Sequence, residues 1–120
     1  MRPLSLRLAA AIMAVGVGGA ASADVITVNV FDFDFSTGGP ADPIADAVIN
    51  LGDTVRWTFI DPSHTTTSVA GIAEQWDSGF IAPGLSFDHT FNTLGSFQYF
   101  CQAHGFDMGN GAAGGMSGTV

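Results

Sequence analysis

Basic residues are scarce in this sequence, and their scarcity limits the partners that the protein can have. Three Lys or Arg stand against 11 Asp or Glu in the 120 residues, and the only basic residue after position 23 is Arg56. All 11 acids lie after that position, so residues 24–120 carry a net charge of 1 − 11 = −10 with His neutral. Phosphate contacts need Lys and Arg, which argues against nucleic acid and anionic membrane surfaces as partners. A protein with a basic surface suits this charge, because opposite fields raise the encounter rate; the same charge also serves solubility alone.

Long apolar runs are also rare, and the one that stands out lies at the N-terminus. Arg2 and Arg7 accompany the Gly- and Ala-rich stretch 8–21, and Ala21-Ser22-Ala23 has the small-x-small form of a cleavage site. A spanning helix needs about 20 apolar residues, which disfavours the alternative of a retained membrane anchor. We therefore expect a signal peptide at 1–23, one domain at 24–120, and a periplasmic or secreted protein with no membrane insertion after cleavage.

Cysteine is almost absent. Cys101 is the single Cys of the chain, so no internal disulfide can form. A lone Cys in an exported protein is an intermolecular link, a reactive thiol or a metal ligand, whereas a free buried Cys is usually a small hydrophobic residue. The residues around Cys101 are needed to distinguish between these roles.

Helical patterning is missing after the signal, apart from one short turn of helix that 68–77 has room for. Residues rich in β-branched and aromatic side chains predict strands at 25–35, 48–51, 54–59, 85–91 and 96–101, and the Pro- and Gly-containing segment 36–47 predicts a loop. The apolar phase of the first strand switches at Val30/Phe31, which predicts a bulge or a bend. Short strands at this spacing predict an all-β sandwich or barrel.

Three segments carry side chains that bind metals. Cys101 and His104 form a Cys-x-x-His at the end of a predicted strand, where the chain can double back so that thiolate and imidazole converge on one ion. His64 follows the strand at 54–59, and a thioether, Met108 or Met116, lies downstream of His104. Two His, one Cys and a weak axial Met form the ligand set of a type 1 copper site.

The neighbouring residues strengthen this interpretation. Five motifs follow one another in the chain: Gly52-Asp53-Thr54-Val55-Arg56-Trp57, His64-Thr65-Thr66-Thr67-Ser68, Pro83-Gly84 with Phe87 and Phe91, Gly95-Ser96-Phe97-Gln98-Tyr99-Phe100-Cys101-x-x-His104, and Gly115-Met116-Ser117-Gly118-Thr119-Val120. In these motifs and their order the sequence resembles plastocyanin-like cupredoxins, the type 1 blue-copper family. The resemblance implies a Greek-key β-sandwich that holds one copper ion on His64, Cys101, His104 and a Met. It also implies that Thr65 braces the loop that contains Cys101.

The axial ligand is the point at which the sequence departs from that family. Met116 keeps the family's strand motif but stands 12 residues beyond His104, with a Gly-rich segment between them. Met108 is nearer to His104, at a spacing that other cupredoxins use. The residues around Met116 place it at the head of a closing strand, so we favour Met116 and keep Met108 as the alternative.

The same resemblance implies a one-electron carrier and not an enzyme. A copper oxidase or nitrite reductase needs further His-rich sites, whereas this chain has three His in all, and His89 is expected to pack on a strand face. The alternative is copper binding and delivery without a dedicated electron-transfer role, which usually relies on open Met- and His-rich clusters. We expect a monomer that exchanges electrons with a redox protein whose docking surface is basic.

Overall fold

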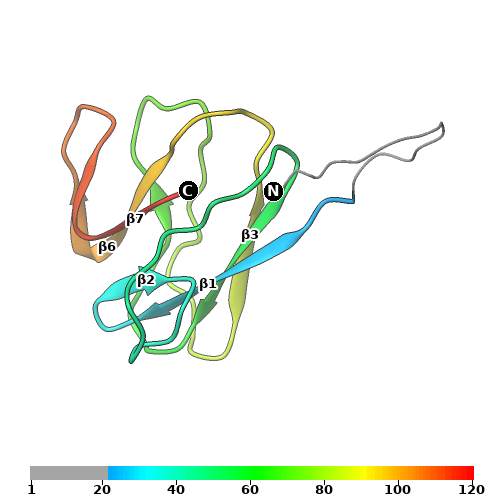
Figure 1. Ribbon diagram of the computed structural model, residues 1–120. Helices are drawn as coiled ribbons and strands as arrows, with labels where there is room; N and C mark the ends of the chain where they lie inside the picture. Colours follow the sequence, from blue (N-terminus) through cyan, green and yellow to red (C-terminus); the bar gives the residue numbers. More distant parts are fainter. Residues whose placement is uncertain (1–21) are drawn as a thin grey trace, which may run out of the picture.

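The computed structural model describes residues 22–120, and within them every regular element is a β-strand (Figure 1). The predicted signal peptide at 1–23 lies outside the described residues, apart from Ser22 and Ala23, and stays a prediction. The strands of the described range are β1 Val25–Phe31, β2 Asp34–Ser36, β3 Thr54–Phe59, β4 Thr67–Ser68, β5 Ser86–Thr90, β6 Gln98–Asp107 and β7 Ala113–Thr119. The predicted all-β class is confirmed.

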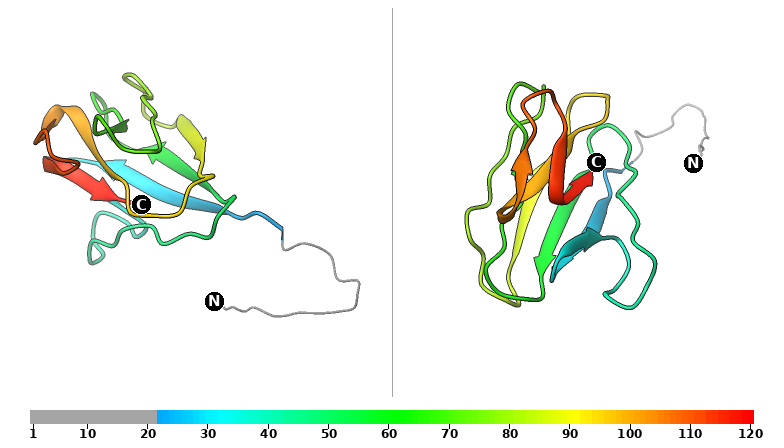
Figure 2. Two further views of the ribbon diagram at one scale, coloured as in Figure 1. Left: turned by 90° about the horizontal axis from the view of Figure 1, so that it is seen from above. Right: turned by 90° about the vertical axis from the view of Figure 1, so that its left-hand side faces the viewer.

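The strands form two sheets that pack against each other as a sandwich (Figure 2). One sheet has the order β2-β1-β3-β5, with β1 and β3 parallel and the other neighbours antiparallel. The other sheet has the order β4-β6-β7 and is antiparallel throughout. Because β1 and β3 are parallel, the chain between them has to cross over, and it does so through the long segment 37–53.

Strand β3 shows how the sequence pattern produces this packing. Val55, Trp57 and Phe59 are fully buried, while the residues between them face outward or are half-buried. Side chains alternate between the two faces of a strand, so this pattern gives β3 one core face and one outer face. The core between the sheets is completed from β1, β6 and β7, including Cys101 and Met116. Two of the sequence-predicted copper ligands are therefore also core residues.

Two of the predicted elements are wrong. Val48–Leu51 is no strand: Val48 is 91% exposed, and the Asp53 carboxylate accepts the Asn50 N–H at 2.9 Å in a turn. The segment 68–77 contains no helical turn, because the Gln75 side-chain amide donates to the carbonyls of Val69 and Ile72, both at 3.0 Å. A short apolar run cannot form a strand without an edge to pair with, and side-chain bonds to backbone carbonyls compete with a helix.

Two other segments differ from the prediction in extent. The bend expected near Val30/Phe31 is a tight turn at residues 32–33 between β1 and β2. The strand expected at 96–101 runs on to residue 107, and the Gly-rich segment beyond His104 pairs with β7 as a hairpin, seen as the orange-to-red turn at the upper left of Figure 1. In the described part of the chain no helix is long and apolar enough to cross a membrane.

Candidate metal centre

Cys101 and His104 lie in a bulge of β6. Strand β6 pairs with β7 up to residue 100 and again from residue 105, so the four residues 101–104 stand opposite the single residue Met116. A bulge bends its strand and redirects its side chains. Here it sends the Cys101 side chain into the core, where it is fully buried, and leaves His104 exposed at the surface.

His64 reaches the same place from the loop between β3 and β4. Ser63 has a φ of 68°, which turns the backbone just before His64, and His64 then forms an isolated bridge with Ile81. The His64 side chain is fully buried. A buried imidazole needs partners for both ring nitrogens.

The three predicted donors converge. Cys101 Sγ lies 3.7 Å from His64 Nδ1 and 3.7 Å from His104 Nδ1, and the ligand atoms of the three residues all lie within 4.8 Å of one another. Typical bonds of about 2.0 Å to nitrogen and about 2.3 Å to sulfur, set 120° apart around one ion, separate the two donors by about 3.7 Å. The spacing and the donor chemistry therefore fit a single metal ion bound in a trigonal His₂Cys set, and that set suits copper.

Thr65 braces the Cys101 segment, as the resemblance implied. Its backbone N–H donates to Cys101 Sγ at 3.4 Å, and its hydroxyl accepts the Gln102 N–H at 3.0 Å. The hydroxyl also pairs with that of Thr67 at 2.9 Å. The N–H bond stabilises negative charge on sulfur, and the hydroxyl bond fixes the loop that carries it.

The two candidate axial residues have different surroundings. Met116 is 3% exposed, belongs to the same core cluster as Cys101, and stands opposite the 101–104 bulge. Met108 is 54% exposed at the turn of the hairpin, where its N–H donates to the Ala112 carbonyl. Burial and register thus favour Met116 over Met108.

The hairpin that separates the two Met residues is held in place and does not hang free. The Asp107 carboxylate accepts the N–H groups of Ala70 and Gly109, both at 2.8 Å, and these bonds lower the pKa of Asp107. The first of them ties the hairpin to the loop after β4. The Gly-rich segment between His104 and Met116 is therefore an ordered part of the fold.

The turn between β1 and β2 contributes two contacts that the sequence did not reveal. Asp32 Oδ1 lies 2.6 Å from His64 Nε2. The exposed ring of Phe33 lies edge-on to the His104 ring, with centroids 4.8 Å apart. Neither residue is near a ligand in the sequence, and only the apolar phase switch beside them marked this segment as unusual.

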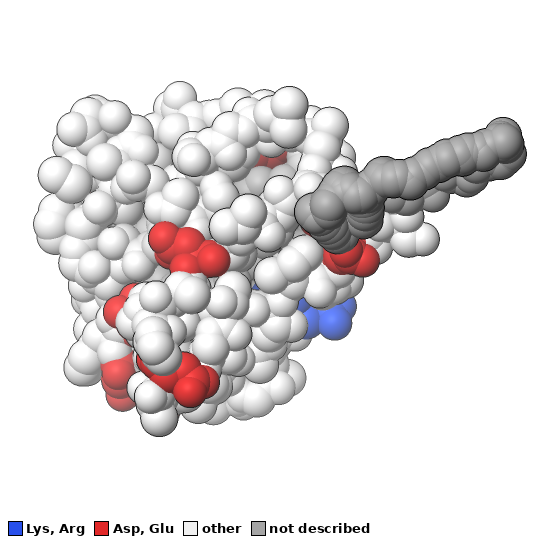
Figure 3. All heavy atoms as spheres, viewed as in Figure 1, with Lys and Arg blue, Asp and Glu red and all other residues white. Residues whose placement is uncertain are grey.

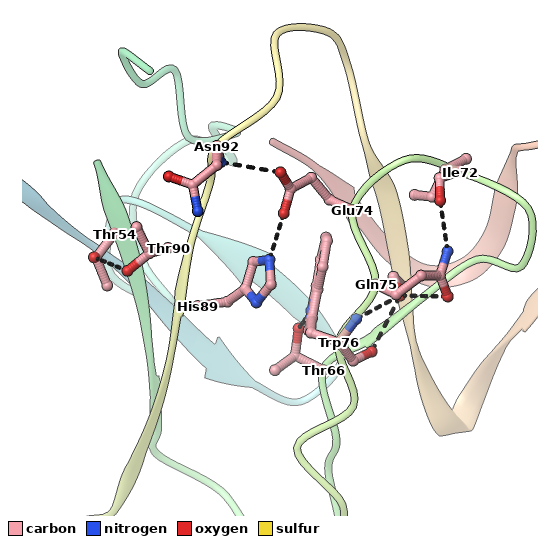
Figure 4. Close-up of polar contacts among 10 residues, drawn as sticks. Thr54, Thr66, Ile72, Glu74, Gln75, Trp76, His89, Thr90 and Asn92 are labelled. Atoms are coloured by element: carbon pink, nitrogen blue, oxygen red, sulfur yellow. Dashed lines mark hydrogen bonds and ion pairs between the residues drawn. The ribbon is translucent and has the colours of Figure 1, made fainter. Parts of the chain in front are cut away.

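His89 lies apart from the metal centre, in a second polar cluster (Figure 4). Its Nε2 pairs with the Glu74 carboxylate at 2.7 Å, and its ring stacks on that of Trp76 with centroids 5.1 Å apart. Burial alone would raise the pKa of Glu74, but hydrogen bonds from His89, the Asn92 backbone and Thr93 outweigh it and lower this pKa. The expectation that His89 packs on a strand face agrees with these contacts.

Solved structures share this architecture. The chain superposes on a Cu-containing nitrite reductase from Thermus scotoductus SA-01 with a TM-score of 0.61 and 19% identity, over 90% of this chain and 24% of that one. It superposes on amicyanin from Paracoccus versutus with a TM-score of 0.57 and 22% identity, over 83% and 82% of the two chains. The chain has the cupredoxin fold.

A third cupredoxin shows the same likeness, and it limits what the likeness means. A pseudoazurin from Sinorhizobium meliloti matches with a TM-score of 0.54 and 21% identity, over 78% of this chain and 72% of that one. The chain thus spans about a quarter of the nitrite reductase but most of the two small cupredoxins. No protein-family profile and no curated protein sequence matches the chain. At these identities the likeness establishes the fold, and the chemistry has to be argued from the site.

Proposed function

We propose that this protein is an exported type 1 copper protein that carries one electron at a time between redox partners. The observation that carries the proposal is the convergence of one buried cysteine sulfur with two imidazoles, each Nδ1 at 3.7 Å from Cys101 Sγ. His64, Cys101 and His104 would hold the ion, with Met116 as the axial ligand. Copper bound there would alternate between Cu(I) and Cu(II), which supplies the one-electron chemistry.

The surroundings of the donors suit electron transfer. Cys101 and His64 are fully buried, so the fold excludes water from their side of the site. His104 is exposed, which offers a short path between the site and a docked partner. Because strand pairing and the Thr65 bonds fix the donors, both oxidation states would share one geometry.

Copper titration of residues 24–120 tests the proposal. We expect one Cu(II) per chain and an intense thiolate-to-copper band in the visible spectrum. Cys101→Ser should abolish the band while leaving an all-β far-UV spectrum, and His89→Gln, a histidine change outside the site, should retain the band. A colourless copper-loaded wild type would show that the assignment is wrong.

Copper delivery is the competing function, and the burial of the ligands argues against it. A protein that hands over its metal must bring its donors to the acceptor, yet only one of the three donors, His104, is exposed. We expect bound Cu(I) to exchange slowly with a small chelator, on a timescale much longer than electron exchange. Rapid and complete transfer to the chelator would favour delivery.

The partner we propose is a redox protein with a basic docking surface. On the face shown in Figure 3, acidic side chains occur at several places and basic atoms at one, in keeping with Arg56 as the only Lys or Arg among residues 22–120. Even Arg56 is paired with Asp88, at 2.9 Å.

Raising ionic strength from 0.01 M to 0.15 M shortens the Debye length from about 30 Å to about 8 Å. The rate of electron exchange with a cationic cytochrome should therefore fall, and a rate independent of salt would leave the charge as a solubility feature.

Export is the part of the proposal that rests on the sequence alone. The signal at 1–23 should be removed in a bacterial host, giving a periplasmic chain that begins at Asp24. Mass spectrometry of the fractionated protein tests this, and an uncleaved cytoplasmic chain would contradict it.

A further inference from the structure

The buried ligand His64 is held from two opposite sides. Its Nδ1 faces Cys101 Sγ at 3.7 Å, and its Nε2 lies 2.6 Å from Asp32 Oδ1. The imidazole is 0% exposed, so among the described residues Asp32 is the partner that satisfies Nε2. A carboxylate that is ionised can only accept a hydrogen bond, so the ring proton in this contact belongs to Nε2.

The position of Asp32 is fixed by a second contact with the same loop. The Asp32 backbone N–H donates to Asp61 Oδ2 at 2.9 Å, and Asp61 stands three residues before His64. The β1–β2 turn and the His64 loop are thus joined by two bonds of opposite direction. This pairing orients the Asp32 carboxylate although its side chain is 48% exposed.

We propose that Asp32 is a positioning residue for copper, acting through His64. The inference rests on the proposed function and deepens it. By accepting the Nε2 proton, Asp32 selects the tautomer that presents the Nδ1 lone pair to the metal, on the side where Cys101 lies. Its charge also makes the imidazole a stronger donor, which favours Cu(II) over Cu(I) and lowers the reduction potential.

Asp32→Asn is the informative change, because it keeps the size of the side chain and an acceptor oxygen but removes the charge. Loss of such a partner typically weakens metal binding about 10- to 100-fold. We expect the larger part of this loss in Cu(II) affinity, and each factor of ten lost from Cu(II) alone raises a one-electron potential by about 59 mV. Voltammetry and competitive copper titration of the blue protein measure the two quantities.

Asp34→Asn is the matched control. Asp34 lies two residues away at the start of β2 and loses the same charge, but its Oδ1 accepts the Phe35 N–H at 2.9 Å and touches no ring nitrogen. We expect this variant to keep nearly the wild-type potential. Equal shifts of the reduction potential in the two variants would mean that only the loss of a nearby charge matters, and this result would overturn the proposal.

A readout that needs no bound copper completes the test. In the metal-free chain, ¹⁵N NMR should find His64 as the single tautomer protonated at Nε2, with a slowly exchanging proton. In Asp32→Ala both neutral tautomers of His64 should be populated, and the ring proton should exchange faster with solvent. Asp32→Glu should partly restore the single tautomer. A colourless wild type would defeat the proposed function itself, while a blue Asp32→Asn variant with unchanged potential and affinity would defeat this inference alone.

Discussion

Replacing Gly105 by Ala tests how closely the two strands of the metal centre approach each other. Gly105 directly follows the candidate ligand His104, at the point where β6 resumes pairing with β7. A Cβ at this position would overlap the Met116 carbonyl oxygen and would lie 2.9 Å from that of Gly114 and 3.2 Å from that of Cys101. All three atoms are backbone, so no side-chain rotation can relieve the contact.

The strands have to separate locally to admit the extra methyl group. Inserting a methyl group into a packed site typically costs about 1–3 kcal/mol of unfolding free energy. For a domain of this size, 1 kcal/mol lowers the melting temperature by about 4–8 °C. The same separation moves His104 and the residue opposite the bulge, Met116, so we also expect weaker copper binding and a changed visible band.

Gly39→Ala is the control, because a Cβ at Gly39 would meet only the movable Asp42 carboxylate, at 3.3 Å. This change should be neutral or should stabilise the protein by about 0.4–1 kcal/mol through the unfolded chain. Denaturant unfolding and copper titration of the two variants give the comparison. If both unfold at the same midpoint and bind copper alike, the close approach of β6 and β7 at Gly105 does not exist in solution.

Two other predictions concern the axial ligand and the second polar cluster. Met116→Leu should keep the blue colour but raise the reduction potential, because loss of a weak donor disfavours Cu(II) more than Cu(I), whereas Met108→Leu should change little; the opposite result in voltammetry would exchange the two assignments. Glu74→Gln should lower the unfolding free energy of the metal-free chain by about 1–3 kcal/mol at neutral pH, since it weakens hydrogen bonds to a buried charge. The pKa of Glu74 in the folded protein lies below its ordinary 4.5. The stabilisation that the Glu74 carboxylate contributes is therefore complete above pH 4.5 and disappears as the pH falls through the lowered pKa. The unfolding free energies of wild type and variant should therefore converge in acid.

The candidate ligands could be identified in the sequence because their signals are local. Cys101 and His104 lie three residues apart, and His64 follows a strand whose alternating pattern at Val55 and Trp57 is unambiguous. Burying the alternating face of a strand in the core also fixes where the strand ends. In the structure the side chains of His64, Cys101 and His104 come together.

The features that the sequence did not predict depend on contacts between segments that are distant along the chain. Asp32 is 32 residues from His64, and no pattern around either residue states that the β1–β2 turn reaches the loop after β3. Val48 is apolar, but whether it pairs in a sheet depends on a free strand edge that only the tertiary structure defines. Local patterns specify faces and ends of strands, whereas the partners of a turn are set by how the sheets pack.

The long spacing between His104 and Met116 is explained by strand register. Residues 105–107 and 113–115 pair with one another, so the added chain leaves the metal centre and returns to it as a hairpin. In such an antiparallel hairpin each residue added to β6 is paired with one added to β7. The length of the hairpin therefore does not change the pairing of the residues that precede it on β6 and follow it on β7. Four residues of β6 therefore still face the single residue Met116. The position of the candidate axial residue Met116 is set by the pairing of β7 with β6 and not by its distance along the chain from His104, which is why a spacing of 12 residues is compatible with the same site.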